Sequence, residues 1–349
     1  MGKSIVGMDI GGSRIRAVEV EGYNKSQPVL VRYGEVTVPV EAIRDGEVVE
    51  PNTVAAALRR LWSTAGFKTK DVAMGVGNQK VLVRDLTVPR LPVKQIREAL
   101  PFQVQDMLPV PVADAILDFY PISEGTGPTG PTISGLLVAA VKATVLANVD
   151  AVQLAGLNPV SVDLKPFALS RILTRGSLST QVVAIIDIGA DTTNVVIADR
   201  SVPQFVRIIP TGGDALTEAL QKRLELNLVD ADQVKRTIGV SRTDVPAEQR
   251  PALEVIFEVT SALLGSLRNT LSFYSNAHAH APVQRIVLTG GASYLPGFAQ
   301  ALGEQTHLPV EYGDPSHGLQ LGKTMDAALL ASRPMDFVVP LGLAIGSAA

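Results

Sequence analysis

The chain has 349 residues, of which 46% are hydrophobic and 19% are charged, so it is too apolar for a disordered protein and long enough for about two domains. Thirty-one Lys and Arg residues oppose 34 Asp and Glu residues, and the net charge of −3 argues against binding to nucleic acid. The absence of cysteine excludes disulfides, thiol catalysis and zinc–thiolate sites. The N-terminus carries no secretory signal pattern, so we expect a cytoplasmic protein.

The first segment predicts two strands joined by a glycine turn. Residues 5–9 form an apolar run that ends at Asp9, and residues 15–21 alternate between apolar and polar side chains. The turn between them contains Gly11, Gly12 and Ser13. A further strand over 29–38 and a helix over 54–65 follow. We expect the helix to be capped by Asn52 or Thr53 and to end at Gly66.

The stretch from residue 72 to residue 156 has short apolar runs separated by prolines. Its pattern predicts, in chain order, a helix over 94–107, a strand over 115–122, a turn-rich loop over 124–132, a strand over 136–141 and a helix over 145–155. We interpret this block as a small α+β unit inserted into the first half of the chain.

The second half begins with a strand pattern that resembles the start of the chain. The tripeptide Asp9–Gly11 recurs as Asp187–Gly189, again between an apolar strand and a second strand over 194–198. This recurrence near the mid-point suggests two related halves. The elements expected after it are helices ending at Arg223 and spanning 230–237, 251–276 and 295–304, and a strand over 286–289.

Two strand-ending carboxylates, each followed by a glycine turn, suit the binding of a metal-bound phosphate chain. The turns expose backbone N–H groups to an anion, and Asp9 and Asp187 can hold Mg²⁺. Arg14 and Arg16 could offset part of the roughly four negative charges of an ATP tail. Either turn alone is equally compatible with an ordinary hairpin; the pair, at equivalent places, favours a shared site.

Two further glycine pairs are candidates for the same site. Gly290 and Gly291 follow a buried strand, and a flat base could lie against their backbone. Gly212 and Gly213 either begin a helix or form another wall of the cleft.

Three segments resemble the nucleotide motifs of the actin, Hsp70 and sugar-kinase superfamily. They stand in the family's order, as phosphate-1, phosphate-2 and adenosine motifs, at residues 6–13, 185–193 and 286–292. Within the superfamily the chain is most similar to the PilM family of type IV pilus assembly proteins, which is related to FtsA. The stretches that carry this closer resemblance are 99–110, 117–120, 211–217, 231–235 and 267–274.

The resemblance implies an α/β, two-lobed actin-like ATPase fold with a small α+β subdomain inserted in the first lobe. The implied division is a first lobe (1–71 and 157–179), an inserted partner-binding subdomain (72–156), a second lobe with nucleotide-binding subdomains (180–335) and a C-terminal segment that returns to the first lobe (336–349).

The resemblance also implies ATP and Mg²⁺ as cofactors and assigns residues to them. Gly11, Gly12 and Ser13 would meet the β- and γ-phosphates, and Asp9 and Asp187 would position Mg²⁺. The second phosphate loop would contain Gly189, Asp191, Thr192 and Thr193. Lys235 would lie near the ribose, and the adenine would be flanked by Gly290, Gly291 and Ala292.

The implied partner is the cytoplasmic N-terminal tail of a PilN-like inner-membrane protein, docked in a groove that involves residues 72–156. Other pilus assembly proteins and self-association are further possibilities, and the chain would reach the inner face of the membrane through its partner. Two alternatives stay open: a filament-forming protein like FtsA or MreB, and a small-molecule kinase of the same superfamily. No residue is identified as catalytic, so ATP binding is a firmer expectation than ATP hydrolysis.

Overall fold

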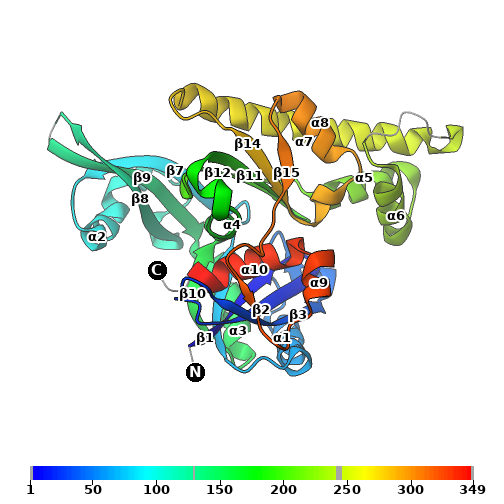
Figure 1. The fold of residues 1–349 in the computed structure, drawn as a ribbon, viewed down its shortest axis with the longest axis horizontal. Helices are drawn as coiled ribbons and strands as arrows, with labels where there is room; N and C mark the ends of the chain where they lie inside the picture. The colour runs from blue at the N-terminus through cyan, green and yellow to red at the C-terminus, as the bar shows by residue number, and fades with distance from the viewer. Residues whose placement is uncertain (1–2, 129, 241–245, 347–349) are drawn as a thin grey trace.

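The computed structural model describes residues 3–128, 130–240 and 246–346. It does not describe residues 1–2, 129, 241–245 and 347–349. A few residues of each predicted division, from the first lobe to the C-terminal segment, therefore lie outside the description. Two mixed β-sheets lie one above the other, with helices between and around them (Figure 1).

The first sheet contains six strands in the order β10-β6-β1-β2-β3-β16. Strands β1, β2 and β3 form an antiparallel meander, while β6 and β10 lie parallel to β1. The strands of this sheet are β1 (Ser4–Ile10), β2 (Arg14–Glu21), β3 (Val29–Thr37), β6 (Asp71–Val76), β10 (Asn158–Leu164) and β16 (Gln320–Leu321).

The second sheet repeats this arrangement with five strands in the order β13-β12-β11-β14-β15. An antiparallel meander again comes first, and β14 and then β15 run parallel to its first strand. Its strands are β11 (Val182–Ile188), β12 (Thr193–Asp199), β13 (Val202–Ile209), β14 (Arg285–Thr289) and β15 (Val310–Tyr312). The shared topology supports the interpretation of two related halves.

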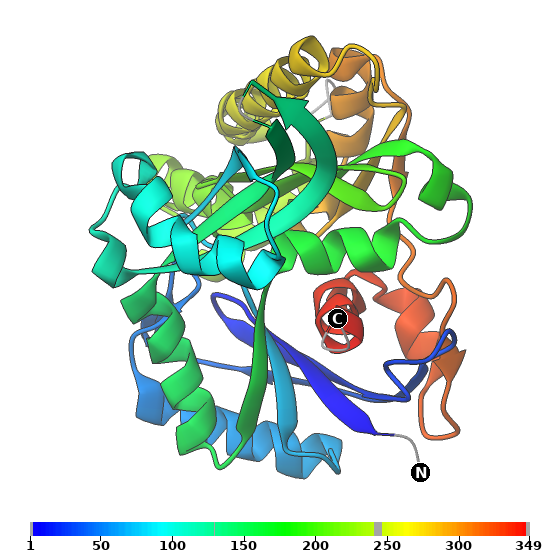
Figure 2. The same ribbon diagram turned by 90° about the vertical axis from the view of Figure 1, so that its left-hand side faces the viewer.

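Two helices fill the space between the sheets. They are α4 (Lys165–Leu173) and α10 (Met335–Gly346), which contact each other, and α10 also lies on β1 and β2. Figure 2 shows α10 end-on beneath α4. The close approach requires a glycine in β1, because a Cβ on Gly7 would lie 1.9 Å from the carbonyl oxygen of Pro340. The central core therefore joins both halves, with fully buried members such as Ile185 and Phe337.

Further helices cover the outer faces of both sheets. The first sheet is covered by α1 (Pro51–Ala65) and α3 (Lys142–Leu154), which pack on each other. The second is covered by α7 (Arg250–Ala277) and α8 (Phe298–Thr306), and α5 (Gly213–Leu224) and α6 (Leu228–Ile238) pack at one end of α7. The small elements that remain are β4 (Ile43–Arg44), β5 (Glu47–Val48) and α9 (Ala327–Ser332).

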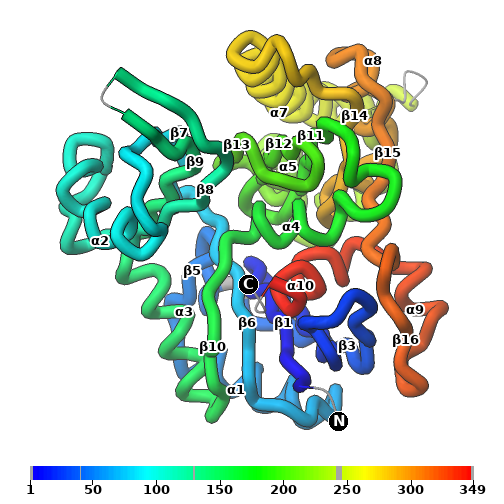
Figure 3. Tube along the Cα trace, turned by 60° about the vertical axis from the view of Figure 1, so that its left-hand side comes forward, coloured from blue at the N-terminus to red at the C-terminus, as the bar shows by residue number. Residues whose placement is uncertain are grey.

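A third sheet, of three strands, projects from one side of the molecule (Figure 3). It consists of β7 (Val81–Pro89), β8 (Ala115–Gly127) and β9 (Gly130–Val141), and α2 (Val93–Gln103) packs against β8. This unit is smaller than the block 72–156 predicted from the sequence. Strand β6 belongs to the first sheet, and α3 packs on α1, so both ends of that block are part of the first lobe.

Several sequence-based boundaries differ from the structure for local reasons. Residues 124–127 and 130–132 are strand, because β8 and β9 pair as far as Gly127 and Gly130; Thr129 of that stretch lies outside the described residues. The helix predicted over 94–107 ends at Gln103 and is followed by a short 3₁₀ turn. Helix α1 begins at Pro51, so Thr53 lies inside it and donates a hydrogen bond to Glu50 rather than capping the backbone.

Candidate functional site

The two predicted glycine turns are built alike. In each, a four-residue loop joins the hairpin strands: Ile10 pairs with Ile15 in the first and Ile188 with Thr193 in the second. Each loop is closed by the same backbone hydrogen bond, from Gly11 N to the Arg14 oxygen (3.0 Å) and from Gly189 N to the Thr192 oxygen (2.9 Å). The sequence repeat therefore corresponds to a geometric repeat.

The two turns meet at the junction of the lobes. A Cβ placed on Gly12 would lie 2.9 Å from Oδ2 of Asp191, so the loops face each other at contact distance. Asp9 also acts electrostatically on Asp187, which places the two strand-ending carboxylates near one another. The predicted convergence of one acidic hairpin from each half is thus present.

The other predicted glycine segments form the wall beside the second turn. Gly213 N donates to the Gly189 oxygen (2.9 Å), and a Cβ on Gly213 would lie 2.8 Å from Cβ of Ala292. Gly290 has φ +89°, and a Cβ there would lie 2.4 Å from the carbonyl oxygen of Ile188. Only glycine fits so close an approach in that backbone conformation.

Asp187 is the most perturbed carboxyl group of the site. Its residue is 8% exposed, and its side chain accepts a hydrogen bond from Asn194 (3.2 Å). Burial raises the pKa of Asp187 to about 6, against the lowering effect of the Asn194 hydrogen bond, and the charge of Asp9 acts in the same direction as burial. Burial also raises the pKa of Asp191, with the charges of Asp214 and Asp45 adding to it.

Lys165 is a cation at this junction that the sequence analysis did not identify. It is the first residue of α4, and its Nζ lies 2.7 Å from Oδ1 of Asp9 and 3.0 Å from the carbonyl oxygen of Ile10. The positive charge of Lys165 opposes the raised pKa values of both Asp187 and Asp191. The sequence contains one signal for this position, a lysine followed by proline at a strand-to-helix junction, Leu164-Lys165-Pro166.

The two arginines predicted to offset phosphate charge have other partners. Arg16 Nε lies 2.9 Å from Asp336 of α10, and Arg14 lies 3.9 Å from Glu35 of β3. Arg333, just before α10, pairs with both of these carboxylates. Strands β2 and β3 are thereby tied to the C-terminal segment. The charge of Arg16 also acts to lower the pKa of Asp187, and contacts of the two arginines with phosphate stay predictions.

Two further predicted residues are close to the site but engaged in local bonds. Lys235 Nζ donates to Thr217 Oγ1 (2.6 Å) and pairs with Asp232 (2.9 Å), and it reaches the Gly213 carbonyl at 3.3 Å. The hydroxyl of Thr193 donates to the carbonyl oxygen of Thr211 (2.7 Å). These bonds fix the wall of the site, and contacts with a ribose or a phosphate stay predictions.

The donor set for a metal ion is incomplete around the two aspartates. Within residues 3–128, 130–240 and 246–346, no cluster of three or more His, Cys, Asp or Glu side chains is arranged to hold a metal. Asp187 is available as a ligand, but the carboxylate of Asp9 is already paired with Lys165. A Mg²⁺ ion at Oδ1 of Asp9 would require movement of Lys165, and the assignment of Mg²⁺ to both aspartates stays a prediction.

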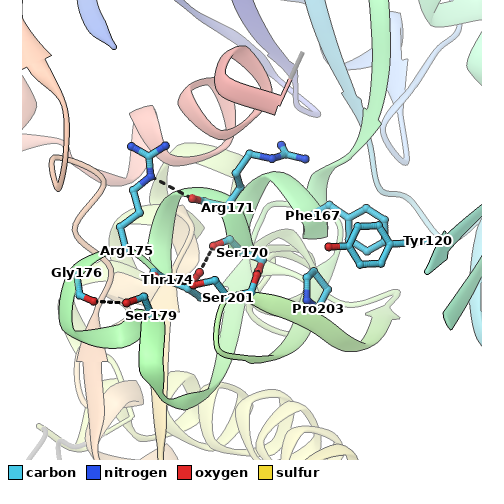
Figure 4. Close-up of a pocket in the computed structure, with 10 residues that line it drawn as sticks. All are labelled: Tyr120, Phe167, Ser170, Arg171, Thr174, Arg175, Gly176, Ser179, Ser201 and Pro203. Carbon is cyan, nitrogen blue, oxygen red and sulfur yellow. Dashed lines mark hydrogen bonds between the residues drawn. The ribbon is translucent and has the colours of Figure 1, made fainter. Parts of the chain in front are cut away.

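A second feature is a pocket of about 470 Å³ where α4, β8 and the turn before β13 meet (Figure 4). Tyr120 and Phe167 form its apolar wall, with ring centroids 4.8 Å apart, and Pro203 lies beside them. Arg171 and Arg175 line the opposite side. Arg171 pairs with Asp163 (2.9 Å), whereas Arg175 has no carboxylate partner among the described residues, and burial together with Arg171 lowers its pKa.

Comparison with known proteins assigns the family. Residues 7–348 match the family described as type IV pilus assembly protein PilM. The chain belongs to the PilM family. A solved PilM–PilN type IV pilus biogenesis complex contains a chain with 27% sequence identity and a TM-score of 0.84, with 99% of this chain and 98% of that chain covered. The family and the actin-like fold expected from the motifs are confirmed.

Other proteins are similar to the chain in sequence or in structure. The cell division protein FtsA of Bacillus subtilis is 24% identical over 280 residues, covering 73% of this chain and 61% of FtsA, so the match spans less than two thirds of that protein. FtsA of Pseudomonas aeruginosa is 25% identical over 353 residues, covering 90% and 84%. MreB 5 of Spiroplasma citri, solved with bound AMPPNP, has 11% identity and a TM-score of 0.53 over 90% of this chain and 92% of MreB.

None of the helices in the described ranges combines the length and apolar character that crossing a bilayer requires. The apolar helix α10 is instead buried between the sheets.

Proposed function

We propose that this member of the PilM family docks the cytoplasmic N-terminal tail of a PilN-like inner-membrane protein and that ATP bound between the lobes modulates the docking. The observation that carries the proposal is the similarity along almost the whole chain to the PilM of a PilM–PilN complex. Function through a PilN-like partner would bring the protein to the inner face of the cell membrane.

ATP binding between the lobes is supported by the paired turns. Gly12 and Asp191 face each other at contact distance, and the glycines of the adenosine segment pack beside them. Backbone N–H groups in such turns form concavities that bind phosphate. The fold is shared with MreB 5, whose solved structure contains an ATP analogue. Binding of Mg²⁺ by Asp187 stays a prediction, and no hydrolysis step is assigned to any residue.

The pocket next to the inserted sheet is the proposed docking site for the tail. It combines an apolar wall, Tyr120 and Phe167, with the guanidinium of Arg175, so it can take a side chain and hydrogen-bond a peptide backbone or carboxylate. Tyr120 belongs to β8 of the inserted sheet, in agreement with the expectation that this unit takes part in docking. The α4 side of the pocket was not anticipated from the sequence.

Helix α4 connects the two sites. Its first residue, Lys165, reaches Asp9 at the junction of the lobes. Further along, the pocket is lined by Phe167, Ser170 and Arg171 of α4 and by Thr174 directly after it. A helix of nine residues spans about 14 Å, so both sites lie on one rigid element. A nucleotide that displaces the start of α4 would also move the pocket wall, which is the proposed route of modulation.

The test is a titration of the full chain with a fluorescently labelled peptide from the cytoplasmic N-terminus of a PilN-like protein, with and without ATP. We expect saturable binding whose affinity changes when ATP is added. Arg175→Glu should weaken peptide binding at least about tenfold by placing a carboxylate in the pocket. The matched control is Arg268→Glu on the exposed face of α7, which should bind like the unmodified chain. Equal affinities for both variants would refute the pocket assignment.

A further inference from the structure

Lys165 is held in a defined position at the junction of the lobes. Its ammonium group contacts Oδ1 of Asp9 (2.7 Å) and the carbonyl oxygen of Ile10 (3.0 Å), the residue directly before the first turn. The side chains of Lys165 and Asp9 are each only 15% exposed. A partly buried ion pair with an additional hydrogen bond is far better ordered than a surface pair.

The fold makes room for the lysine stem by means of glycines at the end of β6. A Cβ on Gly75 would lie 2.9 Å from Cγ of Lys165, and a Cβ on Gly77 would lie 3.0 Å from its Cβ. Neither glycine has a positive φ, so the backbone does not require glycine at these positions. What the two positions require is space, which is occupied by the side chain of Lys165 and, beside Gly75, also by that of Leu343.

The ammonium group of Lys165, a monovalent cation, lies at Asp9, where a divalent metal ion was expected. A Mg²⁺ ion bound at Oδ1 of Asp9 would have to displace the ammonium group, because two cations repel each other strongly at one carboxylate oxygen. The ammonium group is adjacent to the turn that would receive the terminal phosphates. Its three N–H donors are not all used by Asp9 and Ile10, so one remains for a phosphate oxygen.

We propose that Lys165 is a tethered cation of the nucleotide site, which binds the phosphate chain directly and takes the place of a divalent ion at Asp9. Nucleotide binding by this protein then depends only weakly on Mg²⁺. The inference rests on the proposed binding of ATP between the lobes, and it concerns which charge neutralises the phosphates there.

The experiment is isothermal titration of ATP into the full chain, once with excess Mg²⁺ and once with EDTA. For the unmodified chain we expect dissociation constants that differ by less than about threefold between the two conditions. For Lys165→Met, which keeps the length of the stem and removes the charge, we expect a loss of about 10- to 100-fold in EDTA, typical of a lost charged hydrogen bond. With Mg²⁺ the loss should be smaller, since the metal can then occupy Asp9.

The control is Lys70→Met, which removes the same charge from an exposed position before β6 and should leave both constants unchanged. The inference is overturned if the unmodified chain binds ATP with Mg²⁺ but at least about tenfold more weakly in EDTA. It is equally overturned if Lys165→Met binds like the unmodified chain in EDTA. The first comparison needs no variant, so it decides the matter even if Lys165→Met does not fold. Absence of ATP binding in both conditions would instead refute the proposed nucleotide function.

Discussion

Replacement of Asp187 by Asn should stabilise the ligand-free protein at neutral pH. Asp187 is buried at the end of β11, and its pKa is raised from its ordinary value of 3.8 to about 6. Because the folded state holds the proton more tightly than the unfolded state, stability falls as the pH rises through the window from about 4 to about 6. Above that window the full cost of the buried charge is present.

The size of the effect follows from the difference between the two pKa values. A difference of about 2 pH units corresponds to about 3 kcal/mol in the free energy of unfolding, as an upper figure. Asn is nearly the same size, carries no charge, and still offers an oxygen to the hydrogen bond from Asn194. Asp187→Asn should therefore gain up to about 3 kcal/mol at pH 7.5 and nothing at pH 4.

The assay is urea unfolding at a series of pH values between 4 and 8, followed by circular dichroism, with the difference between variant and unmodified chain taken at each pH. Taking the difference removes the contributions of all other titrating groups. Asp150→Asn, at an exposed position of α3, is the matched control and should show no trend. A difference that is constant with pH, or a variant less stable than the unmodified chain at pH 7.5, would show that Asp187 is not a strained buried charge.

Three other outcomes are expected. Gly12→Val should reduce ATP affinity at least about tenfold in calorimetric titration, because the valine side chain would separate the two turns. The control is Gly265→Ala on α7, where a Cβ meets nothing within 4 Å. Equal ATP affinities of the two variants would refute the role of the turns. Glu35→Gln should lose about 1 kcal/mol at pH 7, since the Arg333 hydrogen bond lowers the Glu35 pKa. The loss should shrink as the pH falls below 4.5, and a loss that does not decrease with falling pH would contradict this origin. Gly290→Ala should lower stability by about 1–3 kcal/mol in thermal unfolding, because of its φ of +89° and the close contact with Ile188 at the end of β11, and an unchanged midpoint would mean that the segment relaxes freely.

The helix between the two sites gives the proposed modulation a physical basis. Lys165 and Phe167 are two residues apart on α4, yet one contacts the first turn and the other stacks on Tyr120 of the inserted sheet. Buried contacts with α10 hold the rest of the helix, including a bond from Arg171 to the Gly342 carbonyl oxygen (2.7 Å). We therefore expect a change at either end of α4 to move the whole helix rather than to cause a local rearrangement.

The two hairpins and the fold that they imply are predictable from the sequence alone. An apolar strand, a carboxylate and a glycine turn are local patterns, and their recurrence at Asp9 and Asp187 is visible without coordinates. The alternation of side chains in a strand and the glycines of a turn are local features of the sequence. The predicted bounds of β1, β2, β11 and β12 therefore agree with the structure to within a residue or two.

The pairing of charges at the site depends on long-range packing and is visible in the structure alone. Asp9 is paired with Lys165, more than 150 positions later, and Arg16 with Asp336, more than 300 positions later. A lysine or an arginine carries no local pattern that names its distant partner, because the partner is chosen by the packing of α4 and α10 between the sheets. Local periodicity thus defines the elements, and long-range packing assigns the cations to their carboxylates.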